Sequence, residues 1–396
     1  MLDTPALSEF RSRVRAWAEA NRPLRAPPSG HDELRALMNE YRPKLRAAGY
    51  LAPHWPKEFG GGGFTAAEQV VLKQELAREG IPSFGGIGMH HAAATIMEHG
   101  TPEQREHLAA ILDGESWCQG FSEPNAGSDL AALQCRAVRD RDDYVINGQK
   151  IWSSGAQHSK WCLLLARTDT AAPKHKGISV LMVAMASPGI EVRPIRQATG
   201  ETEFCEVFFS DVRVPVAQRI GPENEGWAIS QTALTNERGS YIVERHAQLV
   251  ETLDDMVAEA AATPVGGGRT ALDDGGIRQE LAERAAEVEV LGMLSETFIG
   301  QLFHHGDIGP ESSIFKLFYS EILQRITGLR TRIRGVGATL EHDRGGLAQD
   351  PSETALLEHI ASWAWTIAAG TNEIQRNIIG ERLLGLPREP SPRPAS

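Results

Sequence analysis

The stretch WCQGFSEPNAGSD, residues 117–129, marks the point at which the pattern of the chain changes. From residue 3 to about residue 112, apolar side chains such as Phe10, Val14 and Trp17 recur at helical spacing, which predicts a helical segment. After the stretch come short runs rich in β-branched and aromatic residues, separated by Gly, Pro, Asn and Asp, which predict a β domain of about a hundred residues. Within it, the Asn147-Gly148 step predicts a hairpin turn.

Helical spacing returns at GPENEGWAI, from residue 221. Apolar positions from Ile277 to Leu302 trace one helical face, and a Gly/Asp-rich break at residues 263–276 separates this helix from the preceding one. ESSIFKLFYSEILQRITGLRTRIRG and TNEIQRNIIGERLLG supply two more helices, which completes a predicted four-helix bundle. The expected α+β multidomain architecture is an all-α N-terminal domain over residues 1–114, a β-barrel-like middle domain over 115–222, a C-terminal four-helix bundle over 223–387 and a disordered tail over 388–396.

Composition narrows the class of protein. The chain has 396 residues, of which 41% are hydrophobic and 23% charged, as is usual for a globular protein with more than one subdomain. Its net charge of −12 disfavours nucleic acid or an anionic membrane as partner, and no segment approaches the ~20 apolar residues of a membrane span. Four cysteines without a CxxC pair favour a reducing, cytoplasmic location, and the histidines show no metal-ligand spacing, so we expect no metal.

Two segments of the predicted β domain place polar groups beside an aromatic ring. FSEPNAGSD, residues 121–129, gathers hydroxyls and backbone amides in a turn, and INGQKIWSSG, residues 146–155, presents Trp152 followed by two hydroxyls. An aromatic face beside converging donors suits a flat, polar-edged heterocycle such as a flavin. By spacing alone, a tryptophan packed in a β core is the commoner explanation.

A third segment, AAGTNEIQRNIIGERLLG, occupies residues 368–385. Asn372 followed by Gln375 resembles a capping box, and Gly370 suits a turn between two helices. The free amides at such a helix start also form a site for anions and polarised oxygens.

GFSEPNAGSDLAA, YVINGQKIWSSGAQHSKWCLLLART, VFFSDVRVP and GTNEIQRNIIGERLLGLP resemble motifs of the acyl-CoA dehydrogenase family, and the resemblance runs in the family's order from about residue 45 to 387. It implies a helix-sheet-helix fold that binds FAD. The implied reaction is α,β-desaturation of an acyl thioester, in which a carboxylate removes the α-proton and a hydride passes from the β-carbon to flavin N5. An electron-transfer flavoprotein is the implied acceptor, and a homodimer or homotetramer the implied assembly.

Carried over by position, the resemblance assigns these residues to the cofactor: Phe121, Ser122, Ser128, Trp152, Ser154, Thr371 and Glu373. The Phe121 backbone and Ser122 would bond the pyrimidine edge of the flavin. Trp152 would pack on the ring and Ser154 would bond near its reactive edge. Ser128 would also contact the pantetheine of the substrate.

The catalytic base departs from the common family pattern. Many members carry a glutamate directly before the Gly-Thr step, where this chain has Ala369. Isovaleryl-type and long-chain-type members place the base on the first bundle helix in a sequence like LxxER, and LTNERG, residues 234–239, puts Glu237 there. Arg238 would contact the CoA phosphates or form a local ion pair. Ala369 and Gly370 are assigned to the substrate, because the amide at position 369 holds the thioester carbonyl in the family.

The segments that meet the FAD tail in the family also depart. TPVGGGRTALDDGG stands where an RxxFG motif is expected, with Arg269 as a candidate replacement, and no Gln-x-x-Gly-Gly motif is found. These losses resemble a bacterial branch that includes α2β2 heterotetramers acting on bulky acyl-CoA such as steroid side chains. A branched, cyclic or bulky acyl group is therefore expected, on CoA or on a carrier protein. The alternatives are a subunit that needs a partner to complete the FAD site and a flavin-dependent monooxygenase of the same fold.

Overall fold

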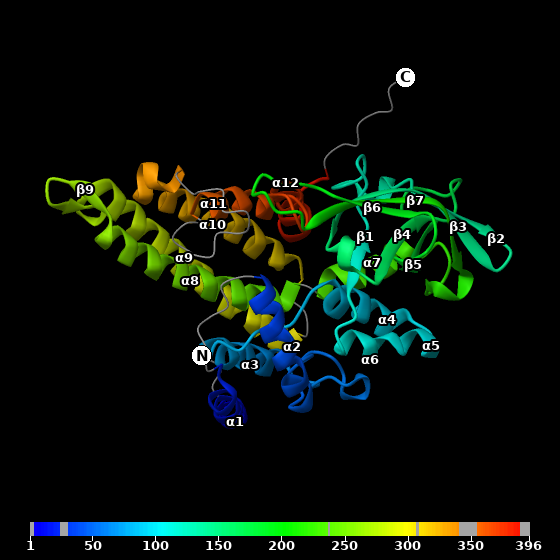
Figure 1. Ribbon diagram of the computed structural model, residues 1–396, viewed down its shortest axis with the longest axis horizontal. Helices are drawn as coiled ribbons and strands as arrows, with labels where there is room; N and C mark the ends of the chain where they lie inside the picture. The colour runs from blue at the N-terminus through cyan, green and yellow to red at the C-terminus, as the bar shows by residue number, and fades with distance from the viewer. Residues whose placement is uncertain (1–3, 24–30, 237, 306–308, 340–354, 389–396) are drawn as a thin grey trace, which may run out of the picture. The chain divides into compact units, whose positions relative to one another are not determined.

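The structure, a computed structural model, describes residues 4–23, 31–236, 238–305, 309–339 and 355–388 (Figure 1). The chain divides into two compact units, Thr4–Arg238 and a second unit that begins at Gly239. The first unit holds the N-terminal helices and the sheet, and the second holds the helical bundle. Each unit is described by itself.

The N-terminal helices begin and end at the residues that capping chemistry favours. Thr65 and Glu68 form a complete capping box at the start of α3, and the Thr4 hydroxyl accepts a hydrogen bond from Leu7 N at the start of α1. A single π-helical turn at Gly88–Ala92 precedes α4. The helices are α1 (Pro5–Asn21), α2 (His31–Ala47), α3 (Ala66–Arg78), α4 (Ala93–His99), α5 (Pro102–Arg105) and α6 (His107–Leu112).

The middle of the chain forms an eight-stranded, mostly antiparallel sheet in the order β6-β7-β3-β2-β4-β5-β8, with β1 paired to β4. The pairs β1–β4 and β2–β4 are parallel. The strands are β1 (Trp117–Gly120), β2 (Arg136–Asp140), β3 (Asp143–Ser154), β4 (Trp161–Arg167), β5 (Ile178–Ala184), β6 (Ile190–Pro194), β7 (Phe204–Pro215) and β8 (Arg219–Ile220).

Strand β4 is buried on both faces, and its alternation separates two cores. Leu163 and Leu165 join the core made by the N-terminal helices, whereas Cys162 and Leu164 join a core on the other face of the sheet. Helix α7 (Gly226–Asn236) packs on β5 and on α4, and Ile229 is buried in the first core. The helices and the sheet therefore share one apolar core, which explains why they form a single unit.

The hairpin turn predicted at Asn147-Gly148 is wrong, because β3 runs through both residues. The turn lies at Arg141 and Asp142, between the paired Asp140 and Asp143. Gly148 instead sits at an irregularity of the ladder with φ 151°, where an added Cβ would lie 2.7 Å from Cys135 Cα. The glycine is needed because β3 approaches the backbone of Cys135 closely here, not because the chain turns.

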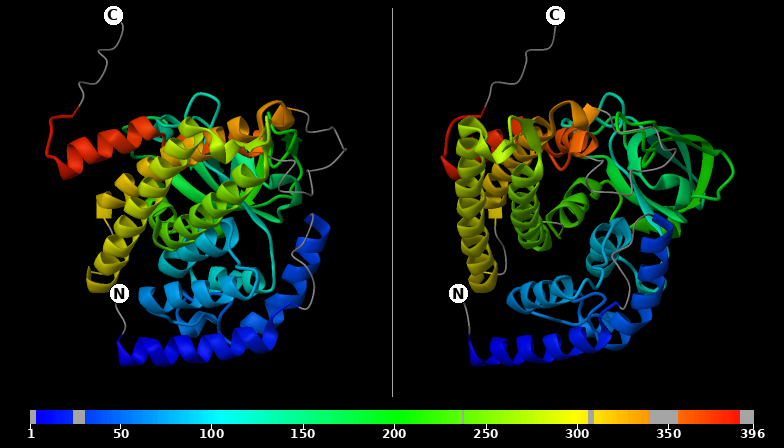
Figure 2. Two further views of the ribbon diagram at one scale, coloured as in Figure 1. Left: turned by 90° about the vertical axis from the view of Figure 1, so that its left-hand side faces the viewer. Right: turned by 60° about the vertical axis from the view of Figure 1, so that its left-hand side comes forward.

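The second unit is a helical bundle built on α10, and α9 and α10 lie side by side in it (Figure 2). Its long helices are α8 (Arg238–Ala262), α9 (Gly275–His305) and α10 (Ser312–Arg334). The shorter α11 (Ala355–Ser362) and α12 (Asn372–Ile378) both pack against α10, in place of one continuous fourth helix. The predicted break after α8 forms a hairpin of β9 (Pro264–Gly266) and β10 (Arg269–Thr270).

Candidate active site

A buried ion pair holds the turn that follows β1. Lys150, which is fully buried, donates from Nζ to the Phe121 carbonyl oxygen (2.9 Å) and to Glu123 Oε1 (2.8 Å). Glu123 in turn accepts hydrogen bonds from the backbone N–H of Gln134 (2.7 Å) and Cys135 (2.8 Å). Because every charged group in this network has partners, the backbone at Phe121 is held in one conformation.

This network leaves the polar edge of the turn open. Phe121 is buried, Ser122 is half-buried and Ser128 is exposed. In the part of the chain that the structure describes, no hydrogen-bond partner is found for the hydroxyls of Ser122, Ser128 and Ser154. Such hydroxyls are available to a ligand or to water.

Trp152 is not a core residue. Its side chain is 56% exposed and its φ is +61°, at an irregularity in the pairing of β3 with β7. A bulky residue in the left-handed region costs roughly 1–3 kcal/mol and is usually found where function requires it. The ring packs in a T-shaped arrangement with the ring of Phe204, with centroids 6.0 Å apart. The alternative of a tryptophan packed in a β core is therefore wrong.

A backbone hydrogen bond brings the two β-domain segments together. The N–H of Ile151 donates to the Ser122 carbonyl oxygen at 3.0 Å, which places Trp152 directly beside the turn. Phe121, Ser122, Trp152 and Ser154, predicted from separate motifs, thus lie along neighbouring backbone. An exposed aromatic ring next to unbonded hydroxyls suits a planar, polar-edged cofactor.

In the second unit, the turn before α12 places Ala369 (φ +53°) and Gly370 (φ +84°) in the left-handed region in succession. The capping residue of α12 is Thr371, whose hydroxyl accepts from Ile374 N, so the capping box expected from Asn372 is wrong. Gln375 Nε2 donates to the carbonyl oxygens of Ala369 (3.0 Å) and Gly370 (3.2 Å) instead of returning to the cap. The side chain of the expected cap points into the bundle.

The same turn offers backbone donors and one carboxylate. Within residues 355–388 and the other described segments, no acceptor is bonded to the N–H of Ala369, Gly370 or Thr371. Glu373 is 78% exposed, and its pKa lies below the usual range because the carboxylate accepts from its own backbone N–H and from the Thr371 hydroxyl. The turn is thus a group of free amides on strained backbone, next to an ionised carboxylate.

Lys316 of α10 reaches this turn from inside the bundle. Its Nζ donates to the Gly370 carbonyl oxygen (2.7 Å) and to Asn372 Oδ1 (3.0 Å), which also accepts from Ser320 Oγ (3.0 Å). Burial lowers the pKa of Lys316 to about 8, although the nearby charge of Glu373 acts in the opposite direction.

Profiles of the acyl-CoA dehydrogenase N-terminal, middle and C-terminal domains match residues 4–115, 118–212 and 224–384. The chain belongs to the acyl-CoA dehydrogenase family. As a member it is an oxidoreductase that acts on acyl-CoA, and the resemblance seen in the sequence is confirmed.

Several acyl-CoA dehydrogenases are similar over most of the chain. FadE34 of Mycobacterium tuberculosis is 40% identical over 90% of this chain, which spans only 47% of that protein. IpdE1 of the same organism is 35% identical over 97% of this chain and 98% of its own length. Among solved structures, the Tcur3481-Tcur3483 steroid ACAD has a TM-score of 0.80 at 31% identity and covers 98% of this chain and 99% of its own. The ChsE4-ChsE5 complex from Mycobacterium tuberculosis has a TM-score of 0.79 at 33% identity, over 98% of this chain and 100% of its own.

The side chains of the residues assigned to the catalytic base and its neighbour are not described by the structure. Glu237 lies outside the described residues, and Arg238 begins α8 with a side chain that is not described. Arg269, the candidate for the missing FAD-tail contact, is exposed and donates to the Asp273 carbonyl oxygen at 3.1 Å.

Three buried residues of this acyl-CoA dehydrogenase were not singled out from sequence: Glu123, Lys150 and Lys316. Lys150 falls on the inward face of β3, in register with the buried Tyr144 and Ile146. The alternation of buried and exposed residues along β3 places this lysine among the inward positions. A buried lysine with a glutamate in a neighbouring motif could therefore have been suspected from sequence. For Lys316 the signal is its helical spacing from buried Tyr319 and Ser320.

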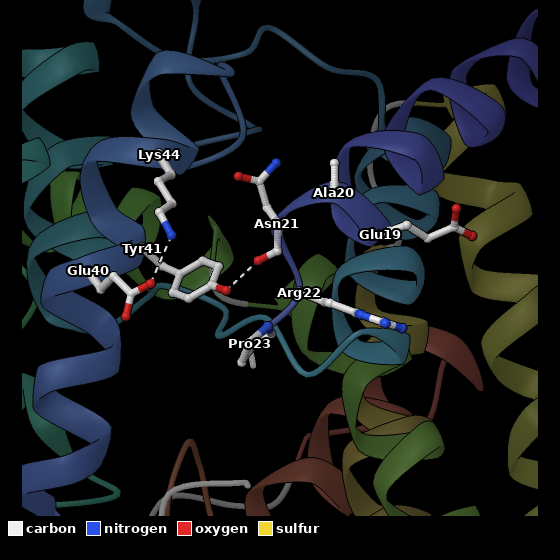
Figure 3. Close-up of a pocket in the computed structure, with 8 residues that line it drawn as sticks. All are labelled: Glu19, Ala20, Asn21, Arg22, Pro23, Glu40, Tyr41 and Lys44. Atoms are coloured by element: carbon white, nitrogen blue, oxygen red, sulfur yellow. Dashed lines mark hydrogen bonds and ion pairs between the residues drawn. The ribbon is translucent and has the colours of Figure 1, made fainter. Parts of the chain in front are cut away.

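A separate cavity of about 490 Å³ lies where α1 ends beside α2 (Figure 3). Its polar groups bond one another, since the Tyr41 hydroxyl donates to the Asn21 carbonyl oxygen and Lys44 pairs with Glu40. No residue assigned to cofactor or substrate lines it. Over the described residues there is no cluster of side chains suited to a metal ion, and no helix there has the length and apolarity to cross a bilayer.

Proposed function

We propose that this acyl-CoA dehydrogenase uses FAD to desaturate a branched, cyclic or otherwise bulky acyl-CoA, with Glu237 as the base that removes the α-proton. The observation that carries the proposal is the turn at Ala369, where backbone donors remain on strained backbone while the side chain has no basic group. A methyl group cannot accept a proton, so another carboxylate must do so. The domain boundaries given by the sequence pattern are retained as part of the proposal.

The residues beside β1 and β3 fit a flavin. The exposed Trp152 ring offers a flat apolar face, and Ser122 and Ser154 offer hydroxyl donors to a polar edge. The backbone N–H of Phe121 would bond the same edge. Ser128 would contribute to both cofactor and pantetheine, and Thr371 with Glu373 would contact the cofactor from the bundle. Bound there, the flavin supplies a two-electron acceptor for the hydride that leaves the β-carbon.

The chain's own residues would handle the proton and the developing charge. An α C–H is acidic enough only if the thioester oxygen is stabilised as it gains enolate character. We assign that stabilisation to the N–H of Ala369, with Gly370 setting the turn, and the proton transfer to Glu237. Arg238 would assist substrate binding.

The preference for bulky acyl groups is supported by the relatives. One similar structure is described as a steroid ACAD, and it shares 31% identity over nearly the full chain. Replacement of glutamate by alanine at position 369 also removes side-chain volume from that part of the site. The acceptor proposed from family resemblance is an electron-transfer flavoprotein, and the assembly a homodimer or homotetramer.

A second possibility is that the chain is one subunit of a heteromer, such as an α2β2 tetramer, which completes its FAD site with a partner. Two observations favour it: the ChsE4-ChsE5 structure is a complex of two different chains, and no RxxFG motif occurs near residues 263–276. Purification of the chain alone separates the two. A yellow protein supports a self-sufficient enzyme, whereas a colourless protein that gains flavin only with a partner supports the heteromer.

The proposed chemistry is tested by an anaerobic titration with a panel of straight, branched and cyclic acyl-CoA, followed by turnover with an artificial electron acceptor. Bleaching of the flavin without oxygen identifies a dehydrogenase and its preferred acyl group. We expect Glu237→Gln to keep its FAD and lose turnover by several orders of magnitude, because the α-proton has no acceptor. Turnover of this variant near the parent rate would show that the base is another residue.

A further inference from the structure

We infer that Lys316 is a positioning residue for catalysis, which holds the turn at Ala369 and Gly370 so that the Ala369 N–H stays directed at the thioester carbonyl. The inference rests on the proposed function and extends it to a residue that touches neither substrate nor flavin. Its basis is the contact of a buried ammonium group with the one turn that is expected to bind the reacting carbonyl.

The turn needs an external restraint. The left-handed region is unfavourable for Ala369 because it carries a Cβ, whereas Gly370 adopts it without steric cost. A free chain would relax away from this conformation. The hydrogen bond from Lys316 Nζ to the Gly370 carbonyl oxygen, at 2.7 Å, fixes the C-terminal side of the turn to α10.

The restraint extends to the first residue of α12. Asn372 is buried, and its Oδ1 accepts from both Lys316 Nζ and Ser320 Oγ at 3.0 Å each. Two side chains of α10, one turn apart, therefore hold both ends of the segment 370–372. Gln375 adds a bond to the Ala369 carbonyl oxygen, which leaves the N–H of Ala369 as the free polar group of that residue.

Stability alone does not explain a lysine at this position. Its acceptors are a carbonyl and an amide oxygen, and among the described residues no carboxylate forms an ion pair with it. Desolvation of the buried ammonium outweighs the attraction of the nearby Glu373 carboxylate, and a well-packed apolar side chain is often as stable as a buried charge or more stable. Without the lysine, the Gly370 carbonyl oxygen still accepts from Gln375 and the Asn372 side-chain oxygen still accepts from Ser320. Neither oxygen is therefore left without a hydrogen bond.

The second buried lysine offers a contrast. Lys150 pairs directly with the Glu123 carboxylate, so removing it leaves a buried charge without a partner. Lys150 is therefore needed for folding of its region, whereas Lys316 is open to substitution without that penalty.

The test compares Lys316→Met with Arg332→Met in the full-length, FAD-loaded protein. Arg332 lies on the same helix and is 57% exposed, so its variant removes a cation without touching the turn. The probe is the 2-enoyl-CoA product of whichever acyl-CoA bleaches the wild-type flavin, labelled with ¹³C at the carbonyl. Its carbonyl stretch, measured at saturation by isotope-edited infrared spectroscopy, reports hydrogen bonding to the thioester oxygen.

We expect Lys316→Met to keep its FAD, to lower kcat about 10- to 100-fold with KM changed far less, and to lose most of the wild-type shift of the carbonyl stretch. Arg332→Met should match the wild type in all three. A purely structural role for Lys316 would not move the carbonyl stretch of bound probe. Ser320→Ala, which removes one of the two donors to Asn372, should show a smaller change in the same direction, and it decides the matter if Lys316→Met does not fold.

The outcomes separate the inference from the proposed function. If the wild-type flavin bleaches while Lys316→Met retains the wild-type kcat and carbonyl shift, the inference is wrong and the proposed function stands. If no acyl-CoA in the panel bleaches the wild-type flavin, the proposed function is wrong and the inference falls with it.

Discussion

Lys150 and Glu123 form an ion pair of 2.8 Å in which the lysine is fully buried and the glutamate is 9% exposed. The lysine belongs to β3 and the glutamate to the turn after β1, so the pair joins the two segments that carry Ser122 and Trp152. The Glu123 carboxylate also accepts hydrogen bonds from two backbone N–H groups, so it is hydrogen-bonded within the protein without water. This one contact sets the backbone of the proposed flavin site.

Lys150→Met should destabilise the protein by about 3–5 kcal/mol, because it leaves the Glu123 carboxylate buried without a counter-charge. The same change should lower flavin content, since the Phe121 carbonyl loses its donor. Urea unfolding and the ratio of flavin to protein absorbance measure the two effects. Lys160→Met is the matched control: Lys160 is 71% exposed and pairs with Glu115, so its loss should cost at most about 1 kcal/mol. Equal effects of the two variants would contradict the role given to the buried pair.

Trp152→Gly should leave the stability of the flavin-free protein within about 1 kcal/mol of the parent, because glycine adopts φ +61° without strain and the lost ring is mostly exposed. Flavin binding should weaken by at least tenfold through loss of the stacking surface. Fluorescence titration with FAD gives the affinity. Val138→Ala, at another exposed apolar position of the sheet (60% exposed), should alter neither quantity. A variant that binds FAD as tightly as the parent would remove Trp152 from the cofactor site.

The double variant Glu237→Gln with Ala369→Glu should regain at least tenfold of the turnover lost by Glu237→Gln alone. The reason is that Ala369 is exposed, and a carboxylate introduced there stands at the position used by many family members. Ala369→Gly is the companion variant: it keeps the N–H, relieves the positive φ and should retain turnover. Steady-state rates with the preferred acyl-CoA measure both. Failure of the double variant with intact FAD would place the base elsewhere.

The pKa of Lys316, lowered by burial from 10.5 to about 8, predicts how stability depends on pH. Between pH 8 and 10.5 the unfolded chain holds a proton on this lysine and the folded chain does not, so folding stability rises with pH across this window. The expected gain is of the order of 1–3 kcal/mol. Lys316→Met should lack it, and at pH 7 this variant should be at least as stable as the parent. Chemical denaturation of both proteins from pH 7 to 10.5 checks the difference, and parallel curves would contradict it.

Much of the architecture is predictable from periodicity, because helices and strands bury one face at fixed intervals. The change from helical to strand spacing near residue 117 and the return near 221 agree with the observed order of elements. Local chemistry was less reliable where a tertiary contact competes with it. Asn147-Gly148 lies inside β3 because Asn147 forms a hydrogen bond with Asp211 on β7 and because glycine leaves room for the backbone of Cys135. The side-chain amide of Asn372 accepts a hydrogen bond from Lys316 instead of capping its helix.

The sequence by itself determined the family and the order of the domains, and it supplied candidates for the site, because motifs and periodicity are local properties of the chain. Ala369 in place of glutamate, and Glu237 in LTNERG, are visible without any coordinates. Only the tertiary structure decided which charges are buried and what they hold: Lys150 on Glu123 and Phe121, Lys316 on Gly370 and Asn372. Burial depends on contacts between segments that are distant in the chain. Because burying a charge is costly, each buried lysine must meet suitable hydrogen-bond acceptors on another segment.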